Sequence, residues 1–195
     1  VLVIRTRTRC DAGLLEGSSV RMIATATIGV DHIDLNYCAS RGIRVHNAEG
    51  CNAGGVMQYV FSALYGVASR KSIKLDDAVF GIIGVGHVGK KVAELAEYLG
   101  FKVLLCDPPR AEKEGYEGFC ELEYLLANSD VVTLHVPLDE TTRKMADEEF
   151  FMLMPPGAIF INASRGEIVD DAALIQAIPK LGAVVIDTWN NEPHV

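Results

Sequence analysis

The chain has 195 residues, of which 49% are hydrophobic, 23% charged and 7% aromatic, and this average composition excludes a disordered, collagen-like or coiled-coil protein. Its 18 basic and 26 acidic side chains give a net charge of −8, which argues against a general affinity for nucleic acid or for anionic membranes. The five cysteines are scattered and include no C-x-x-C pair, so we expect a cytoplasmic protein without a disulfide framework or a metal site.

Residues 1–50 contain short and irregular apolar segments. Strands are predicted over residues 1–5, 21–26 and 43–46, and a helix is predicted over residues 35–40. Arg5, Arg7 and Arg9 alternate with threonines, so on a continuous strand the three arginines would share one face. That face is either a phosphate-binding row or a charged strand end in water.

Residues 51–69 form a stretch of 19 residues without a charged side chain. The stretch contains three glycines and several polar residues, so it is too polar for a membrane span. It predicts instead a helix buried between packed layers, with Asn52 as its N-cap and with Arg70 and Lys71 at its negative C-terminal end.

From residue 78 onward, predicted strands and helices alternate. Each strand is apolar throughout, which indicates a parallel sheet that is covered on both faces. We therefore predict a doubly wound α/β domain with strands at residues 78–83, 101–106, 131–136, 158–161 and 183–186, and with helices at residues 90–99, 121–127, 147–154 and 171–178.

Residues 84–89 read G-x-G-x-x-G between a predicted strand and a predicted helix, which is the context in which this motif binds a dinucleotide. Gly84 would allow a tight turn, and Gly86 would let a pyrophosphate approach the backbone. Gly89 would let the helix pack closely on the strand. The alternative is a strand–turn–helix connection that only needs small residues.

Asp107 ends the next predicted strand, 18 residues beyond Gly89, where a carboxylate would bind the hydroxyls of the adenosine ribose. A carboxylate at this point would repel a 2′-phosphate, which favours NAD over NADP, although Arg110 lies close by in the sequence. The alternative for Asp107 is a solvated residue that opens an Asp-Pro-Pro turn.

Ligands of doubly wound sheets bind outside the carboxyl ends of the strands. A hydride-transfer site for a hydroxy acid needs a cation for the carboxylate, a base for the hydroxyl proton and an acidic partner for that base. Arg165 and Glu192 follow the last two predicted strands and fit the first and third of these roles. The alternatives are an arginine paired with a nearby carboxylate and a glutamate in an ordinary turn.

Four ordered motifs resemble the D-isomer-specific 2-hydroxyacid dehydrogenases, at residues 84–89, 135–138, 162–170 and 187–193. Further matches at residues 24–34, 50–53 and 106–111 are most similar to the members that act on 4-phospho-D-erythronate. The resemblance implies a Rossmann NAD-binding domain at residues 51–195 without its C-terminal part. It also implies a truncated, smaller α/β flavodoxin-like substrate-binding domain at residues 1–50.

The resemblance also implies roles for individual residues. Arg165 would anchor the substrate carboxylate, and Glu192 would support a catalytic histidine that lies beyond this chain. Thr6 and Thr27 match substrate-contacting positions, and His135 is expected to be a positioning residue. The implied cofactor contacts are Gly84, Gly86, His87, Val88, Gly89, Asp107, Val136, Ala163, Ser164, Arg165 and Asp187.

The activity that the resemblance implies is the NAD-dependent oxidation of 4-phospho-D-erythronate to its 2-oxo acid, in pyridoxal 5′-phosphate biosynthesis, by a homodimer. Two alternatives stay open, namely another D-2-hydroxy acid such as 3-phosphoglycerate as the substrate, and a non-catalytic NAD-sensing regulatory protein. Without the histidine, the chain as it stands is expected to bind NAD but not to turn over. Residues 139–146 and 178–182 form shorter connections than those of similar proteins.

Overall fold

The structure, a computed structural model, describes residues 1–27 and 29–190. The chain divides into two compact units, Val1–Asn52 and Ala53–Val195, and each unit is described by itself. The expected boundary lies after residue 50, two residues before the observed division.

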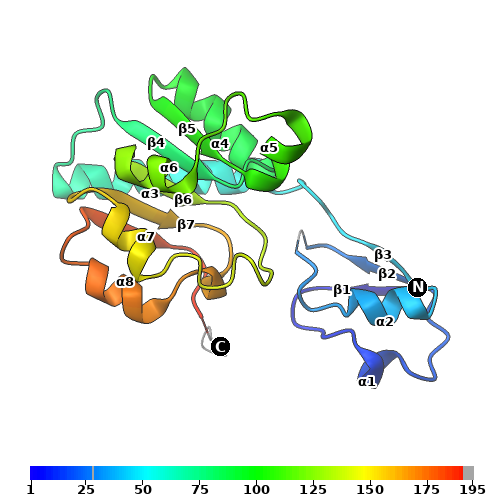
Figure 1. The fold of residues 1–195 in the computed structure, drawn as a ribbon. Coiled ribbons are helices and arrows are strands. Elements are labelled where there is room, and N and C mark those ends of the chain that lie inside the picture. Colours follow the sequence, from blue (N-terminus) through cyan, green and yellow to red (C-terminus); the bar gives the residue numbers. More distant parts are fainter. Residues whose placement is uncertain (28, 191–195) are drawn as a thin grey trace. The chain divides into compact units, whose positions relative to one another are not determined.

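The smaller unit is a three-stranded parallel sheet in the order β1-β2-β3 (Figure 1). Its core is built from apolar side chains of all five elements and their connections, for example Ile4, Ile23 and Cys38. Asp34 caps the second helix, because its carboxylate accepts a hydrogen bond from the Tyr37 N–H at 2.8 Å. The elements are β1 (Leu2–Ile4), α1 (Ala12–Leu15), β2 (Met22–Thr25), α2 (Leu35–Ser40) and β3 (Arg44–His46).

The prediction that Arg5, Arg7 and Arg9 share one face of a strand is wrong. β1 ends at Ile4, and a turn follows in which the Thr8 N–H donates to the Arg5 carbonyl at 3.2 Å. The pairing of β1 with β2 also stops at Ile4, so no neighbouring strand keeps the arginines extended. Arg9 forms an exposed ion pair with Asp11 at 3.1 Å.

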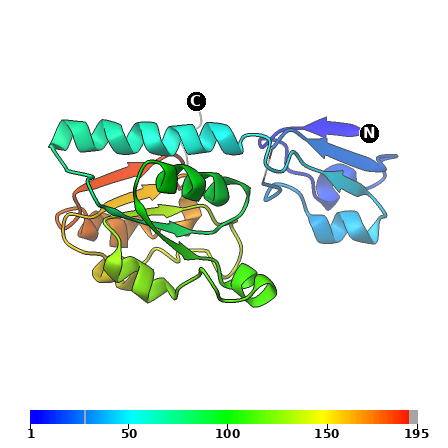
Figure 2. The same cartoon turned by 90° about the horizontal axis from the view of Figure 1, so that it is seen from above.

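The larger unit is a five-stranded parallel sheet in the order β5-β4-β6-β7-β8, with helices on both faces (Figures 1 and 2). This arrangement confirms the predicted doubly wound fold. The elements are α3 (Ala53–Lys71), β4 (Val79–Ile83), α4 (His87–Tyr98), β5 (Lys102–Cys106), α5 (Pro108–Glu114), α6 (Leu122–Asn128), β6 (Val131–Leu134), α7 (Glu148–Leu153), β7 (Ile159–Asn162), the 3₁₀ helix η1 (Gly166–Ile168), α8 (Asp171–Ala177) and β8 (Ala183–Ile186).

Two apolar cores lie on the two faces of this sheet. On one face, α3 and α4 pack against side chains such as Phe80 and Ile82 of β4. On the other face, α6, α7 and α8 pack around Phe160 of β7, whose ring meets those of Phe150 and Phe151 edge to face at 5.8 and 5.0 Å. Because both faces are covered, each strand can be apolar throughout.

The charge-free segment forms the helix α3, whose Phe61 ring lies 5.6 Å from the Phe80 ring. Arg70 and Lys71 occupy its last turn, as predicted. Across residues 1–27 and 29–190, no helix combines the length and the apolar character that crossing a membrane requires.

The helices α4 and α5 differ most from the prediction, and the short 3₁₀ helix η1 was not predicted either. α4 begins at His87, three residues before the predicted start. α5 was not predicted, because its two prolines read as a turn. Pro108 and Pro109 instead occupy the first positions of the helix, where a missing N–H costs nothing, and Asp107 caps it.

Candidate functional site

The chain order of the larger sheet reverses at β4, which has β5 on one side and β6 on the other. Gly84 directly follows β4, and its N–H donates to the Cys106 carbonyl at the end of β5 at 2.9 Å. His135 directly follows β6, and its N–H donates to the Ile83 carbonyl at 2.7 Å. In an open parallel sheet, a ligand binds at the point where the strand order reverses, outside the carboxyl ends of the strands.

The glycines of the motif shape this point of the sheet. Gly84 has a φ of +85°, and a Cβ there would lie 2.7 Å from the carbonyl carbon of His135 and 2.9 Å from Cγ1 of Val136. A Cβ on Gly89 would overlap the Gly84 carbonyl oxygen, whereas a Cβ on Gly86 would meet open space. The turn is therefore tight, α4 packs closely on β4, and the start of α4 is open to a ligand.

Gly86 is the N-cap of α4 and offers no side-chain acceptor to the first N–H groups of this 12-residue helix. Free N–H groups and the positive end of the helix dipole favour an anion such as a pyrophosphate. His87 is exposed and Val88 half-buried in the first turn. The cradle thus fits the diphosphate of a dinucleotide.

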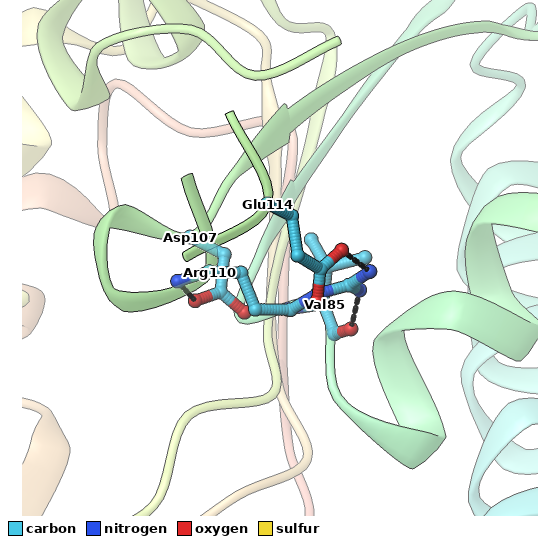
Figure 3. A network of polar contacts seen from close by, with 4 residues as sticks. All are labelled: Val85, Asp107, Arg110 and Glu114. Atoms are coloured by element: carbon cyan, nitrogen blue, oxygen red, sulfur yellow. Dashed lines mark hydrogen bonds and ion pairs between the residues drawn. The ribbon is translucent and has the colours of Figure 1, made fainter. Parts of the chain in front are cut away.

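Asp107 follows β5 and ties its carboxylate to the glycine loop (Figure 3). One carboxylate oxygen accepts the Val85 N–H at 2.7 Å, and the other accepts the Arg110 N–H at 3.1 Å. The residue is half-buried, which does not fit the alternative of a solvated strand end. Each carboxylate oxygen keeps a further lone pair that can accept a ribose hydroxyl.

Arg110 is bound to the same loop and to Glu114 (Figure 3). Its Nη1 donates to the Val85 carbonyl, and its Nε donates to Glu114 Oε1 at 2.8 Å. Nη2 completes a bidentate ion pair with Glu114 Oε2, and these hydrogen bonds hold the pKa of the Glu114 carboxyl below its usual value. Cζ of Arg110 lies 5.6 Å from the ring centroid of Phe119.

Sequence reasoning missed Glu114. The available signal was its spacing of four residues from Arg110, which brings the two side chains together on a helix. Because residues 107–109 were interpreted as a turn and no helix was predicted there, this spacing did not predict an ion pair between Arg110 and Glu114.

The candidate arginine follows β7 in a loop that the buried Asn162 organises. Asn162 donates from Nδ2 to the Arg165 carbonyl at 2.9 Å, and its Oδ1 accepts the Ser164 N–H at 3.0 Å. The buried Ser164 hydroxyl donates to the Leu134 carbonyl at the end of β6 at 2.7 Å. The backbone of residues 163–165 is therefore fixed to the ends of both β6 and β7.

The segment after β8 packs on this loop. The Asp187 N–H donates to the Asn162 carbonyl at 2.9 Å, and the Thr188 hydroxyl donates to the Ser164 carbonyl at 3.1 Å. A Cβ on Gly166 would overlap the Trp189 backbone. Arg165 and Asp187 thus come from two loops in direct contact, whereas Glu192 lies outside the described residues. Sequence reasoning assigned no role to Asn162 or Thr188.

His135 belongs to the same edge of the sheet and carries an unusual ring. Its Nε2 lies 3.1 Å from the hydroxyl of the fully buried Thr133, and within the described part of the chain no group bonds its buried Nδ1. Burial lowers the pKa of His135 to about 4. The imidazole is therefore neutral near pH 7.

The two candidate substrate residues of the smaller unit follow neighbouring parallel strands. Thr6 lies exposed in the turn after β1, and Thr27 lies half-buried after β2. The Thr27 hydroxyl donates to the Gly29 carbonyl at 2.8 Å and contacts the Thr25 hydroxyl at 2.7 Å. Both threonines are at the carboxyl edge of the same sheet.

Residues 61–195 match the sequence model of the NAD-binding domain of the D-isomer specific 2-hydroxyacid dehydrogenases. The chain belongs to this family. Family membership confirms the predicted resemblance, and the matching model is that of an NAD-binding domain, so NAD is the cofactor of the larger unit. An NAD-binding domain fits the glycine turn, the open start of α4 and the carboxylate of Asp107 described above.

Several curated relatives of similar sequence share one name. The erythronate-4-phosphate dehydrogenase of Bacteroides fragilis is 46% identical over 200 residues, an alignment that covers 100% of this chain and 58% of the relative. The chain therefore spans little more than half the length of the curated relatives it matches.

Among solved structures, the D-lactate dehydrogenase of Aquifex aeolicus complexed with NAD and lactic acid is 30% identical, with a TM-score of 0.87, over 97% of this chain and 64% of that chain. An acyclic imino acid reductase in complex with NADPH is 25% identical, with a TM-score of 0.85, over 96% of this chain and 68% of that chain. The same fold thus occurs with both dinucleotides.

Proposed function

We propose that this chain is part of an NAD-dependent dehydrogenase that oxidises 4-phospho-D-erythronate to its 2-oxo acid in pyridoxal 5′-phosphate biosynthesis. The observation that carries the proposal is the 46% identity to an erythronate-4-phosphate dehydrogenase along the full length of this chain. The site chemistry supports it. The loop after β7, which carries Arg165, contacts the segment after β8, which carries Asp187, at the carboxyl edge of the sheet.

In this proposal the larger unit holds NAD by side chains and backbone of the segments that follow the five strands of its sheet. The glycine loop and the start of α4, including His87 and Val88, bind the pyrophosphate, and Asp107 binds the adenosine ribose. Val136, residues 163–165 and Asp187 line the nicotinamide end, with Asp187 facing the carboxamide. NAD held by these residues would supply the hydride acceptor for oxidation at C2 of the substrate.

Arg165 holds the substrate at its carboxylate end. Arg165 binds the carboxylate and polarises the oxygen on C2. Its planar guanidinium can donate two parallel hydrogen bonds to a carboxylate. The rigid backbone under Arg165 limits the freedom of this side chain, and orientation of this kind lowers the barrier to reaction. Thr6 and Thr27 of the substrate-binding unit contact the substrate, and Glu192 supports the proton-exchanging histidine.

The full-length protein is proposed to be a cytoplasmic homodimer. The five free cysteines of this chain, of which Cys51 is exposed, fit a reducing compartment. Sedimentation equilibrium of the full-length protein tests the oligomeric state, and a monomer at micromolar concentration would contradict the dimer.

The activity is tested by following NADH formation with the full-length protein on 4-phospho-D-erythronate and on 3-phosphoglycerate. We expect a higher kcat/KM on the four-carbon acid. A clear preference for 3-phosphoglycerate would assign the protein to another reaction of the same family. NAD binding without turnover of either acid would favour a regulatory protein.

A further inference from the structure

An arginine placed shortly after the ribose-binding carboxylate is the side chain that accommodates a 2′-phosphate in NADP-binding proteins of this fold class. Arg110 stands at that place, three residues after Asp107, yet its guanidinium is occupied. The Nε–Nη2 edge, which would form a fork with a phosphate, is bound to the two oxygens of Glu114. Nη1, which belongs to the other edge, donates to the Val85 carbonyl.

The contacts of Arg110 also fix its position. Its guanidinium lies over the Phe119 ring, with Cζ 5.6 Å from the centroid. Both backbone polar groups of Val85 are bound by side chains, because Asp107 accepts a hydrogen bond from its N–H and Arg110 donates one to its carbonyl. The Arg110 guanidinium therefore binds the protein's own backbone and the Glu114 carboxylate.

The charge around Glu114 indicates what its removal would do. Lys90 of α4 and Lys113 of α5 also lie near enough to Glu114 to lower the pKa of its carboxyl, after the larger effect of Arg110. Glu114 is thus an anion that lies close to the three cations Arg110, Lys90 and Lys113. Without its charge, this edge of the site would become more positive and therefore more attractive for a phosphate.

We propose that Glu114 is a positioning residue that selects NAD over NADP by holding Arg110 on the glycine loop and away from a 2′-phosphate. The inference depends on the proposed position of the adenosine ribose at Asp107. It adds a second determinant to the repulsion by Asp107, because the arginine that could offset that repulsion is withheld. The fold itself accepts NADPH in an imino acid reductase, so the choice depends on side chains such as these.

Substitution of Glu114 by glutamine tests the inference in the full-length protein. The variant keeps the size of the side chain but removes the ion pair, and Glu114 is exposed enough for the fold to tolerate the change, with 52% of its side chain accessible. We expect Glu114→Gln to increase the affinity for NADPH relative to NADH on the order of tenfold, since a charge-assisted contact to the phosphate becomes possible. Fluorescence titration with NADH and with NADPH measures both dissociation constants.

Two further variants separate the proposed cause from other effects. Glu112→Gln makes the same charge change at an exposed position of the same helix. It is expected to leave the ratio of the NADPH and NADH dissociation constants as in the wild type. In the double variant Arg110→Met/Glu114→Gln, the gain in NADPH affinity is expected to disappear, because the gain acts through Arg110.

The inference is overturned if Glu114→Gln leaves the ratio unchanged, if Glu112→Gln raises it equally, or if the gain persists without Arg110. If the wild-type protein binds no NADH, the proposed function itself fails, and the inference fails with it. An unchanged ratio in a protein that binds NADH tightly contradicts only the role of Glu114.

Discussion

Asn162 donates a hydrogen bond from its side chain to the backbone carbonyl of Arg165 at 2.9 Å, and so fixes the candidate catalytic arginine from the buried end of β7. The same side chain accepts a hydrogen bond from the Ser164 N–H. Both polar atoms of the Asn162 amide therefore bind the backbone of the loop that connects β7 to Arg165. The backbone of Arg165 is therefore held by a residue that itself has no exposed surface.

Asn162→Ala is expected to lower kcat by about tenfold or more while KM changes less, because the loop under Arg165 loses both of its supporting hydrogen bonds. The free energy of unfolding is expected to fall by about 2 kcal/mol, since a buried N–H and a buried carbonyl lose their partner. Steady-state kinetics and urea unfolding of the full-length protein measure the two effects.

Asn128→Ala is the matched control, because Asn128 also donates from Nδ2 to a backbone carbonyl but at an exposed position far along the chain. It is expected to leave kcat unchanged. A normal kcat for Asn162→Ala would show that the loop needs no such support.

Arg165→Lys is expected to reduce kcat/KM by about tenfold to a hundredfold, because lysine keeps the positive charge but loses the planar fork that grips a carboxylate. Thermal unfolding is expected to change little, since Asn162 fixes the loop through the backbone of Arg165, and a lysine side chain can also donate to the Ser164 carbonyl that Arg165 Nη1 contacts at 3.2 Å. Arg143→Lys, at an exposed position, controls for the exchange itself. Equal kcat/KM values for Arg165→Lys and the wild type would remove Arg165 from the substrate site.

Asp107→Ala is expected to weaken NADH binding by about tenfold or more, because the ribose hydroxyls lose a charged acceptor. The substitution also removes the cap of α5, which costs about 1 kcal/mol of stability. Isothermal titration with NADH and thermal unfolding measure the two losses separately.

Asp147→Ala serves as the control for the cap alone, because Asp147 caps α7 through the Phe150 N–H at 3.0 Å and has no proposed cofactor contact. We expect it to lower stability but not NADH affinity. Unchanged NADH affinity in Asp107→Ala would contradict the ribose role.

The buried imidazole of His135 predicts a pH dependence of stability. Its pKa is lowered to about 4 in the folded chain, from about 6.5 when unfolded, so the unfolded chain binds more protons between these two values. Stability from this group is complete above about pH 6.5 and is lost as the pH falls toward 4, with an upper bound of about 3 kcal/mol.

Urea unfolding of the wild type and of His135→Gln across this pH range measures the effect as a difference, which removes the contribution of the carboxylates common to both. His87→Gln, at an exposed position, is expected to retain the wild-type pH dependence. Parallel pH profiles for the wild type and His135→Gln would contradict a neutral buried ring.

The larger unit followed from the sequence because its strands are uniformly apolar and its glycine motif stands between a strand and a helix. The helix α2 was predicted with its observed bounds, Leu35–Ser40, and the strand β8 with its bounds Ala183–Ile186. Both are delimited by residues with strong local preferences, such as the capping Asp34 of α2.

The failures have a common physical origin in contacts that local sequence does not contain. β1 ends at Ile4 because its partner strand stops pairing there, although the alternation of arginine and threonine continues. The role of Asn162 depends on its hydrogen bond to the Arg165 carbonyl, which forms only in the folded loop. Asp107 and the two prolines after it permit either a turn or a capped helix, and packing of α5 on the glycine loop decided between them.

The Val85 peptide has both of its polar groups satisfied by side chains of the following βα unit, Asp107 and Arg110. The shape of the cofactor loop is therefore encoded in part outside the glycine motif. A graft of residues 84–89 alone into another parallel sheet would transfer the glycines but not the two side chains that hold the loop in its binding form. The transferable unit is the strand–loop–helix together with the strand end and helix that follow it.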